Sequence, residues 1–101
     1  MNINIEEKDN EIIVKLDGRL DKLSSPELDA ELQPIMEKDK NIVFDLKNLI
    51  YISSAGLRIL LATKKTMKAK GKDISIINIG DDVKDILVVS GFIQLLGLLQ
   101  Q

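Results

Sequence analysis

The chain has 101 residues, of which 45% are hydrophobic and 30% charged, with a net charge of −2. It has no cysteine and no histidine, which excludes disulfides, thiolate or Ser–His catalysis and nearly all zinc sites. We therefore expect neither an enzyme nor a bound metal or cofactor. The few aromatic residues and the slightly negative charge argue against nucleic-acid binding. No signal peptide or membrane-spanning run is present, so we expect no membrane insertion and a cytoplasmic location.

The N-terminal segment predicts a β-hairpin. Residues 3–7 and 11–16 each alternate apolar and polar side chains, which is the pattern of strands that bury one face. The polar break at 8–10 is typical of the turn in an antiparallel pair. Asp17-Gly18 then predicts the end of the second strand.

A helix is predicted to follow the hairpin. Ser24 and Glu27 have the spacing of a capping box, in which each side chain accepts a bond from a free backbone N–H of the other residue. Pro26 lies between them and suits the first helical turn, where a missing N–H costs no hydrogen bond. Pro34 lies inside the predicted helix and should kink it or end it early.

From residue 42 onward the pattern predicts strands alternating with helices. Such an order indicates a parallel sheet with right-handed crossovers. We therefore predict one α/β domain over residues 1–101, with a mixed, mostly parallel sheet, an N-terminal hairpin and helices packed on the sheet. Gly71 should end the first of these helices, and the apolar tail at 92–101 is ambiguous between strand and helix. The predicted elements are strands at 42–46 and 74–79, helices at about 54–70 and 80–91, and a connector at 47–53.

Two serines and a glycine lie where the 42–46 strand leads into the 54–70 helix. Ser53-Ser54-Ala55-Gly56 places hydroxyls at a helix start, where backbone N–H groups lack intrahelical partners and the macrodipole is positive. A serine there can cap the helix or carry a phosphate. Glycine in the first turn destabilises a helix by about 1 kcal/mol relative to alanine. Its presence here would be explained if a phosphate or a partner's backbone must approach closely. The alternative is an ordinary cap followed by small residues that let the helix pack tightly on the sheet.

Charged residues outside this turn have both structural and functional interpretations. Asp21 is either an ordinary loop carboxylate or part of a site at the carboxyl end of the sheet, where it should lie beside the Ser54 turn. A Mg²⁺ site built from Asp21 and Asp45 is a further alternative. A run of lysines most simply forms a solvated helix face, with contact to an acidic partner or a membrane surface as the alternative; it consists of Lys64, Lys65, Lys68, Lys70 and Lys72.

These segments together resemble the anti-sigma factor antagonists of the STAS domain family. Gly18-Arg19-Leu20-Asp21 resembles that family's G-x-[LI]-D segment, and Ser53-Ser54-Ala55-Gly56-Leu57 resembles its D-S-[ST]-G-L switch motif. The 42–46 run resembles its central strand, and Ser90-Gly91 its late S-G turn. The resemblance covers essentially the whole chain. It departs from the switch motif at two positions, where Ser53 replaces an aspartate and Ala55 a hydroxyl residue.

The resemblance implies a regulatory binding protein. The serine two positions before the glycine, Ser54, is the implied phosphorylation site, and Ser53 is the alternative acceptor. Unmodified proteins of this kind bind an anti-sigma factor that is a serine kinase, and so free a sigma factor for transcription. Phosphorylation releases the kinase, and a PP2C-type phosphatase restores the unmodified form. The expected partner-binding residues are Asp21, Ser53, Ser54, Gly56 and Arg58, the last lying one helical turn after Ser54 and able to pair with its phosphate.

Two other functions remain open at the level of sequence. One is a STAS subunit of a lipid-transport or signalling assembly that is never phosphorylated. The other is a small protein that binds or hydrolyses nucleotides. Co-purification distinguishes the first alternative, because a histidine-kinase-like ATPase would accompany an antagonist and a transporter ATPase would accompany a transport subunit.

Overall fold

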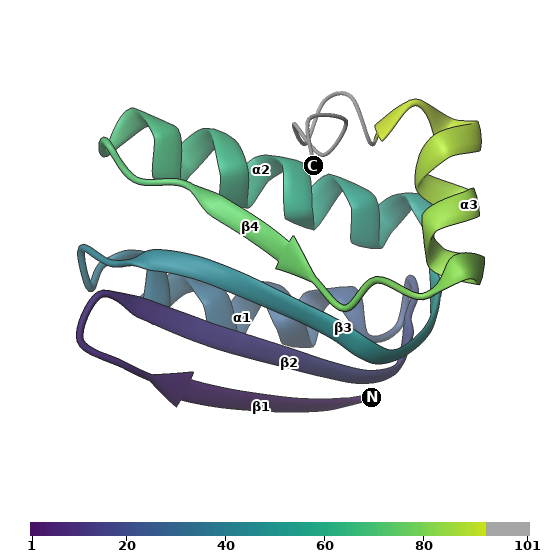
Figure 1. Ribbon diagram of the computed structural model, residues 1–101, viewed down its shortest axis with the longest axis horizontal. Helices are drawn as coiled ribbons and strands as arrows, with labels where there is room; N and C mark the ends of the chain where they lie inside the picture. Colours follow the sequence, from purple (N-terminus) through teal and green to yellow (C-terminus); the bar gives the residue numbers. More distant parts are fainter. Residues whose placement is uncertain (93–101) are drawn as a thin grey trace.

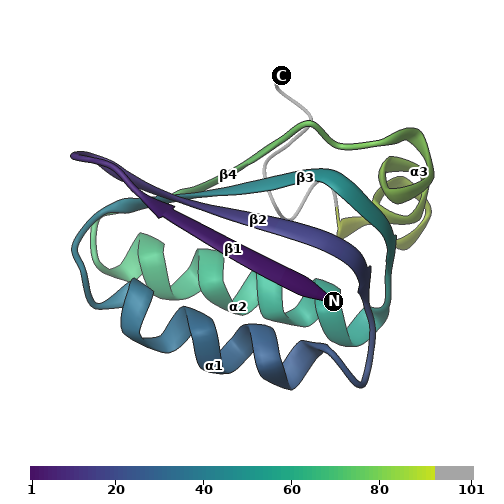
Figure 2. The same ribbon diagram turned by 90° about the horizontal axis from the view of Figure 1, so that it is seen from below.

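The computed structural model describes residues 1–92, which form one four-stranded sheet covered by helices (Figures 1 and 2). The elements are β1 (Asn2–Glu7), β2 (Glu11–Leu20), α1 (Ser25–Met36), β3 (Asn41–Ile52), α2 (Ser54–Ala69), β4 (Ile74–Ile77) and α3 (Asp81–Ser90). The strand order is β1-β2-β3-β4, with β1 antiparallel to β2 and the other neighbours parallel. The predicted α/β class, mixed sheet and N-terminal hairpin are confirmed. The tail lies outside the described residues from residue 93 onward.

The core lies between the sheet and the pair α1 and α2, which lie side by side on one face (Figure 2). Alternate residues of the central strands point into it, because successive side chains of a strand point to opposite faces. These buried residues are Ile12, Val14 and Leu16 of β2 with Ile42, Phe44 and Leu46 of β3. Helix α3 packs instead at the carboxyl end of β3 (Figure 1). No helix within residues 1–92 has the length and apolar character needed to cross a bilayer.

Strands β2 and β3 both continue past their predicted ends. Lys15 pairs with Asp45 but Asp17 pairs with Asn48, so β3 advances by three residues while β2 advances by two, and a second shift follows Gly18. These shifts are β-bulges, and Gly18 adopts φ +108 at one of them, a conformation that side chains rarely allow. The predicted strand end at Asp17-Gly18 and the connector at 47–53 are therefore wrong. The extra length carries both strands to the start of α2.

The helix boundaries agree more closely with the sequence, with one exception. The predicted capping box at α1 is wrong, because Ser24 has helical backbone angles (φ −90, ψ −18) and its side chain caps nothing. Pro26 lies in the first turn as predicted, and Pro34 lies in the last, two residues before α1 ends at Met36. Strand β4 ends at Ile77, two residues earlier than predicted, because Asn78 turns the chain with a left-handed φ of 56.

Candidate functional site

The start of α2 is capped by Ser53. Its backbone is extended (φ −92, ψ 173), and its Oγ accepts a hydrogen bond from the Gly56 N–H at 3.3 Å. Its carbonyl oxygen accepts the Leu57 N–H at 2.9 Å. This carbonyl bond is the first intrahelical one. The four N–H groups that the helix start leaves without intrahelical partners are those of residues 53–56, of which Gly56 donates to Ser53 Oγ and Ser53 donates to the Leu20 carbonyl oxygen. The N–H groups of Ser54 and Ala55 are the other two.

The two serines of the turn therefore have different environments. Ser53 is half-buried and its hydroxyl serves the helix, whereas Ser54 is the first residue of α2 and is exposed. Within residues 1–92, the Ser54 hydroxyl makes no hydrogen bond to another residue. An exposed hydroxyl at the positive end of a helix is chemically suited to carry a phosphate. A kinase acting on Ser53 would have to reach a half-buried hydroxyl whose oxygen already accepts the Gly56 N–H.

Gly56 is explained by packing. A Cβ built on it would lie 2.7 Å from Leu20 Cγ, closer than real Cβ contacts, and 3.0 Å from Ile52 Cγ1, tighter than most of them. Gly56 is itself buried, so no phosphate or partner backbone approaches it from solvent. The expectation that a close-approaching ligand explains this glycine is wrong; tight helix-to-sheet packing explains it. Any contribution of Gly56 to partner binding is indirect, through the position of the turn.

The loop between β2 and α1 lies directly beside the Ser54 turn. The Ser53 N–H donates to the Leu20 carbonyl oxygen at 2.8 Å, which extends the β2–β3 ladder to the end of both strands. Asp21 follows Leu20 and therefore lies at the same end of the sheet as Ser54. The structure thus brings together the two segments that the sequence singled out, because strands of a parallel pair end at the same edge.

Asp21 shapes this loop. Its Oδ1 accepts hydrogen bonds from the backbone N–H groups of Leu23 at 3.0 Å and Ser24 at 3.1 Å. Ser24 Oγ in turn donates to the Arg19 carbonyl oxygen at 2.7 Å and accepts the Asp21 N–H at 2.9 Å. These hydrogen bonds, the one from the Ser24 N–H above all, lower the pKa of Asp21. The carboxylate is therefore ionised at neutral pH, and one of its oxygens is used within the loop.

The Asp21–Asp45 magnesium alternative is contradicted by the geometry. Asp45 pairs with Lys15, which lies six positions before Asp21 in the chain, so roughly 20 Å of strand separates the two carboxylates. Asp45 instead accepts hydrogen bonds from Asn78 Nδ2 at 3.1 Å and the Lys47 N–H at 3.0 Å. Residues 1–92 contain no group of three or more acidic, histidine or cysteine side chains that could hold a metal ion.

Arg58 lies near the same end of the molecule. So do two features that the sequence did not predict, an Arg19–Tyr51 stack and an exposed Leu23. Arg58 is exposed, one turn into α2, and makes no ion pair with the described residues. Arg19 stacks on the Tyr51 ring at 4.3 Å from its centroid, and Leu23 is 89% exposed on the Asp21 loop. Tyrosine and arginine are frequent at the energetic centres of interfaces. The Arg19–Tyr51 pair is invisible in the sequence because the β-bulges set its register.

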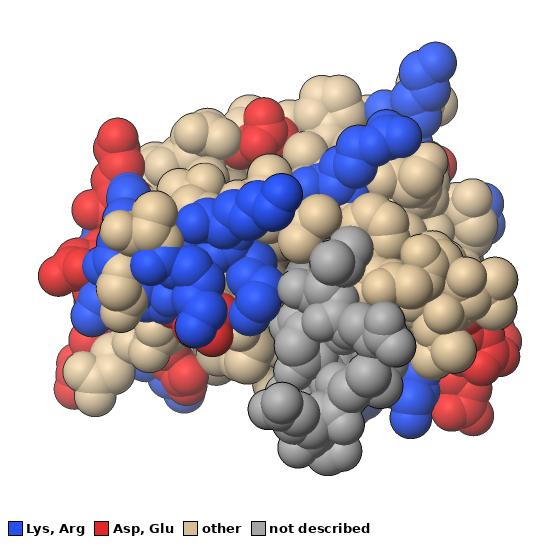
Figure 3. Space-filling view, turned by 90° about the horizontal axis from the view of Figure 1, so that it is seen from above, with Lys and Arg blue, Asp and Glu red and all other residues tan. Residues whose placement is uncertain are grey.

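The lysine run follows α2 to its far end, where basic side chains gather (Figure 3). Two of these lysines form ion pairs with one carboxylate, with Asp73 lying 2.9 Å from Lys64 Nζ and 3.3 Å from Lys68 Nζ. Lys70 donates to the Met36 carbonyl oxygen at 2.8 Å and so ties α2 to the end of α1. These contacts support the interpretation of the run as a solvated helix face with structural contacts.

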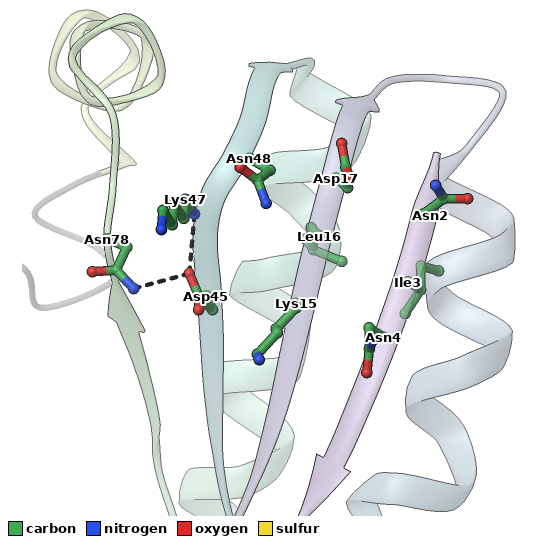
Figure 4. A pocket seen from close by; sticks show the side chains of 10 residues that line it. All are labelled: Asn2, Ile3, Asn4, Lys15, Leu16, Asp17, Asp45, Lys47, Asn48 and Asn78. Carbon is green, nitrogen blue, oxygen red and sulfur yellow. Dashed lines mark hydrogen bonds between the residues drawn. The ribbon is translucent and has the colours of Figure 1, made fainter.

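The uncovered face of the sheet carries a shallow polar pocket of about 710 Å³ (Figure 4). Its lining includes Lys15, Asp17, Asp45, Lys47 and several asparagines from β1, β3 and the segment after β4. Ser54 is not among the lining residues. The pocket belongs to the face opposite α1 and α2, and it is separate from the Ser54 turn.

Comparisons with known proteins agree with this geometry. The chain matches the STAS domain family over residues 2–100. It is 31% identical over 93 residues to the anti-sigma-B factor antagonist of Bacillus subtilis, covering 90% of this chain and 85% of that protein. The anti-sigma factor antagonist SpoIIAA in its unphosphorylated form has the same fold, with a TM-score of 0.77, 18% identity and coverage of 90% and 82% of the two chains. The phosphorylated form of SpoIIAA, a Bacillus cell fate determinant, gives a TM-score of 0.70 at 17% identity, with coverage of 90% and 85%.

Proposed function

Because this chain belongs to the STAS domain family, we propose that it is an anti-sigma factor antagonist controlled by phosphorylation of Ser54. In this proposal the unmodified protein binds an anti-sigma factor with serine kinase activity and thereby frees a sigma factor. The kinase then phosphorylates Ser54 and dissociates, and a PP2C-type phosphatase resets the protein. The chain itself acts by binding and catalyses nothing. Its place of action is the cytoplasm, where sigma factors meet RNA polymerase.

The observation that carries the proposal is the different use of the two serines. Ser54 is exposed and its hydroxyl is free of other bonds within residues 1–92, while Ser53 is half-buried and caps α2 through Gly56. A kinase can reach the Ser54 hydroxyl without disturbing the helix. The relative from Bacillus subtilis is named as an anti-sigma-B factor antagonist, and SpoIIAA has been solved in phosphorylated and unphosphorylated forms, both of which share this fold.

The proposed contact surface for the kinase combines the Ser54 turn with the Asp21 loop. The bond between the Ser53 N–H and the Leu20 carbonyl oxygen holds the two segments together. Asp21 keeps a negative charge at this surface, because its hydrogen bonds lower its pKa. Arg58 adds an exposed cation one helical turn from Ser54. The surface therefore carries charges of both signs in the neighbourhood of the acceptor hydroxyl.

A phosphate on Ser54 should change binding rather than folding. It adds about −1.5 to −2 charges at neutral pH, next to the positive end of the α2 dipole and the N–H groups of Ser54 and Ala55, which have no acceptor within residues 1–92. Arg58 can pair with it as well. Because these groups favour a negative charge, the domain tolerates the modification. The added bulk and charge then act on the partner's surface, where steric exclusion and repulsion from acidic groups promote release.

The direct test is incubation of the protein with ATP and a candidate anti-sigma factor kinase from the same genome, followed by phosphopeptide mapping. We expect one phosphate on Ser54. Ser54→Ala should remove it, and the matched variant Ser53→Ala should keep it. Modification of Ser53 alone would contradict the assignment. No modification, together with co-purification of a transporter ATPase, would favour the alternative of a non-phosphorylated STAS subunit.

Binding measurements with phosphomimetic variants test the switch itself. Ser54→Asp should keep the melting temperature within a few degrees, equivalent to under ~1 kcal/mol, yet bind the kinase at least ~10-fold more weakly. Ser54→Ala should bind the kinase but should not be released by ATP. Calorimetry on both variants, with and without the kinase, measures these effects. If Ser54→Asp unfolds, or binds as tightly as the parent chain, the proposed surface mechanism is wrong.

A further inference from the structure

The outer edge of β1 is an unpaired sheet edge without the usual protection against strand pairing. Among the described residues β1 pairs only with β2, in an unbroken register that runs from Asn2↔Asp17 to Glu7↔Ile12. Exposed edges pair with strands of other chains unless proline, lysine, a bulge or very short length prevents it. β1 has six residues and none of these features, whereas β4, at the opposite edge of the sheet, has only four residues.

The two carboxylates of β1 do not protect the edge either, because lysines of the same chain neutralise both. Lys15 Nζ lies 3.2 Å from Glu6 Oε1. Lys38 and Lys40 each contact one carboxylate oxygen of Glu7 at 2.8 Å, and they lower the pKa of Glu7 to about 2. Glu7 is therefore charged but paired at neutral pH. A second strand approaching β1 therefore meets no unpaired carboxylate, and the five paired groups together carry one positive charge.

The side chains of β1 are complementary to a second copy of β1. Ile3 lies opposite the buried Leu16 of β2 and therefore points to the helix-covered face. Ile5 lies opposite the buried Val14 on the same face but is still 37% exposed. Asn4 points to the other face (Figure 4). In an antiparallel pair of β1 strands centred on Asn4, Ile5 of one copy lies beside Ile3 of the other, which covers its exposed surface.

We infer that β1 pairs antiparallel with β1 of a second copy, forming a two-fold symmetric dimer with one sheet continuous across both copies. A shift of the register by one residue would place Ile3 opposite Glu6 on the same face, so the apolar pattern selects the register centred on Asn4. Only about five residues of each strand take part. This contact is smaller than a standard interface, so we expect a weak dimer with a Kd on the order of 100 μM.

The dimer leaves the Ser54 turn of each copy accessible. Strand β2 lies between β1 and β3, so the new contact forms at the edge of the sheet farther from β3 and the start of α2 (Figures 1 and 2). The dimer would therefore present two Ser54 turns. The inference depends on the edge of β1 alone and holds whether or not Ser54 is phosphorylated.

Sedimentation equilibrium between about 10 μM and 1 mM tests the association. The parent chain should shift from monomer to dimer across this range. Asn4→Lys and Asn4→Asp should each weaken self-association at least ~5-fold, because like charges then lie directly opposite across the two-fold axis. An equimolar mixture of these two variants should restore the dimer. Asn48→Lys, which changes an exposed asparagine on β3, is the matched control and should dimerise like the parent.

Cysteine cross-linking tests the register, because the chain has no cysteine of its own. Asn4→Cys places two thiols on opposite strands at a separation that a disulfide can span, so oxidation should give a covalent dimer much faster than for Asn48→Cys. A parent chain that remains monomeric up to about 1 mM overturns the inference. A dimer that Asn4→Lys leaves intact, or equal cross-linking of both cysteine variants, also overturns it, since the contact would then lie elsewhere.

Discussion

Gly56→Ala is a substitution for which sequence and structure predict opposite effects on stability. By helix propensity alone, alanine in place of glycine inside α2 should stabilise the protein by about 1 kcal/mol. The structure predicts a loss, because the new Cβ would lie 2.7 Å from Leu20 Cγ and 3.0 Å from Ile52 Cγ1. Leu20 is fully buried and Ile52 is 1% exposed, so neither side chain can turn into solvent to make room.

The size of the loss follows from two opposing terms. Overpacking a core by one methyl group costs about 1–3 kcal/mol. This contact belongs in the upper half of that range, because Leu20 Cγ is a branch point rather than the end of a flexible side chain. Subtracting about 1 kcal/mol for helix propensity leaves a net loss of about 1–2 kcal/mol. For a domain of this size, each kcal/mol lowers the melting temperature by about 4–8 °C.

Urea and thermal unfolding of three variants measure this effect. Gly56→Ala should be less stable than the parent chain. Ala62→Gly, at an exposed position of the same helix, is the matched control and should lose about 1 kcal/mol through propensity alone. In the background of Leu20→Ala, which removes the closest clashing atom and leaves space next to Ile52, Gly56→Ala should become neutral or stabilising. A stability gain of about 1 kcal/mol for Gly56→Ala in the parent chain would refute the packing argument.

Three variants test the cap of α2 and the ion pairs of β1. Ser53→Ala should lower the free energy of unfolding by about 1 kcal/mol, because it leaves the Gly56 N–H without its acceptor, and Ser54→Ala should lower it by less; urea unfolding compares them. The pKa of Glu7 is lowered from 4.5 to about 2 in the folded protein, so its ion pairs stabilise the fold at neutral pH and lose this effect as the pH falls from about 4.5 towards 2. Glu7→Gln should therefore flatten the stability profile in that window, and a profile parallel to that of the parent chain would contradict the assignment.

The sequence predicted the architecture well because the apolar periodicity is clear in most elements. The boundaries of α2 and α3 agree closely with the prediction, since Ser53, Gly71 and Gly91 are strong local signals for helix ends. The length of β3 was missed because bulges leave no mark in the sequence. Asp17-Gly18 has the composition of a turn, yet Gly18 serves a bulge inside a longer strand.

The sequence predicted that the Asp21 loop lies beside the Ser54 turn, but it did not predict the hydrogen bonds within these segments. The Ser24–Glu27 spacing indicates a capping box, but the Ser24 hydroxyl is bonded to Arg19 and Asp21 instead. Composition cannot show with which of several nearby backbone groups a serine hydroxyl forms its hydrogen bond. For the same reason the sequence left open whether Gly56 serves a ligand or the core, and only the positions of the Leu20 and Ile52 side chains answer that question.

The difference between Ser53 and the aspartate of the family motif also has an electrostatic consequence. Serine and aspartate are both strong N-caps, so the exchange keeps α2 capped while removing one negative charge next to the Ser54 hydroxyl. Ala55 adds no charge either, so the turn that we propose as the partner contact is neutral before modification. A phosphate then changes the local charge from about 0 to about −1.5 to −2, beside a helix end that stabilises it by roughly 0.3–1 kcal/mol. Because the helix end favours this charge, we expect the proposed phosphate to weaken partner binding through bulk and repulsion at the interface rather than by destabilising the fold.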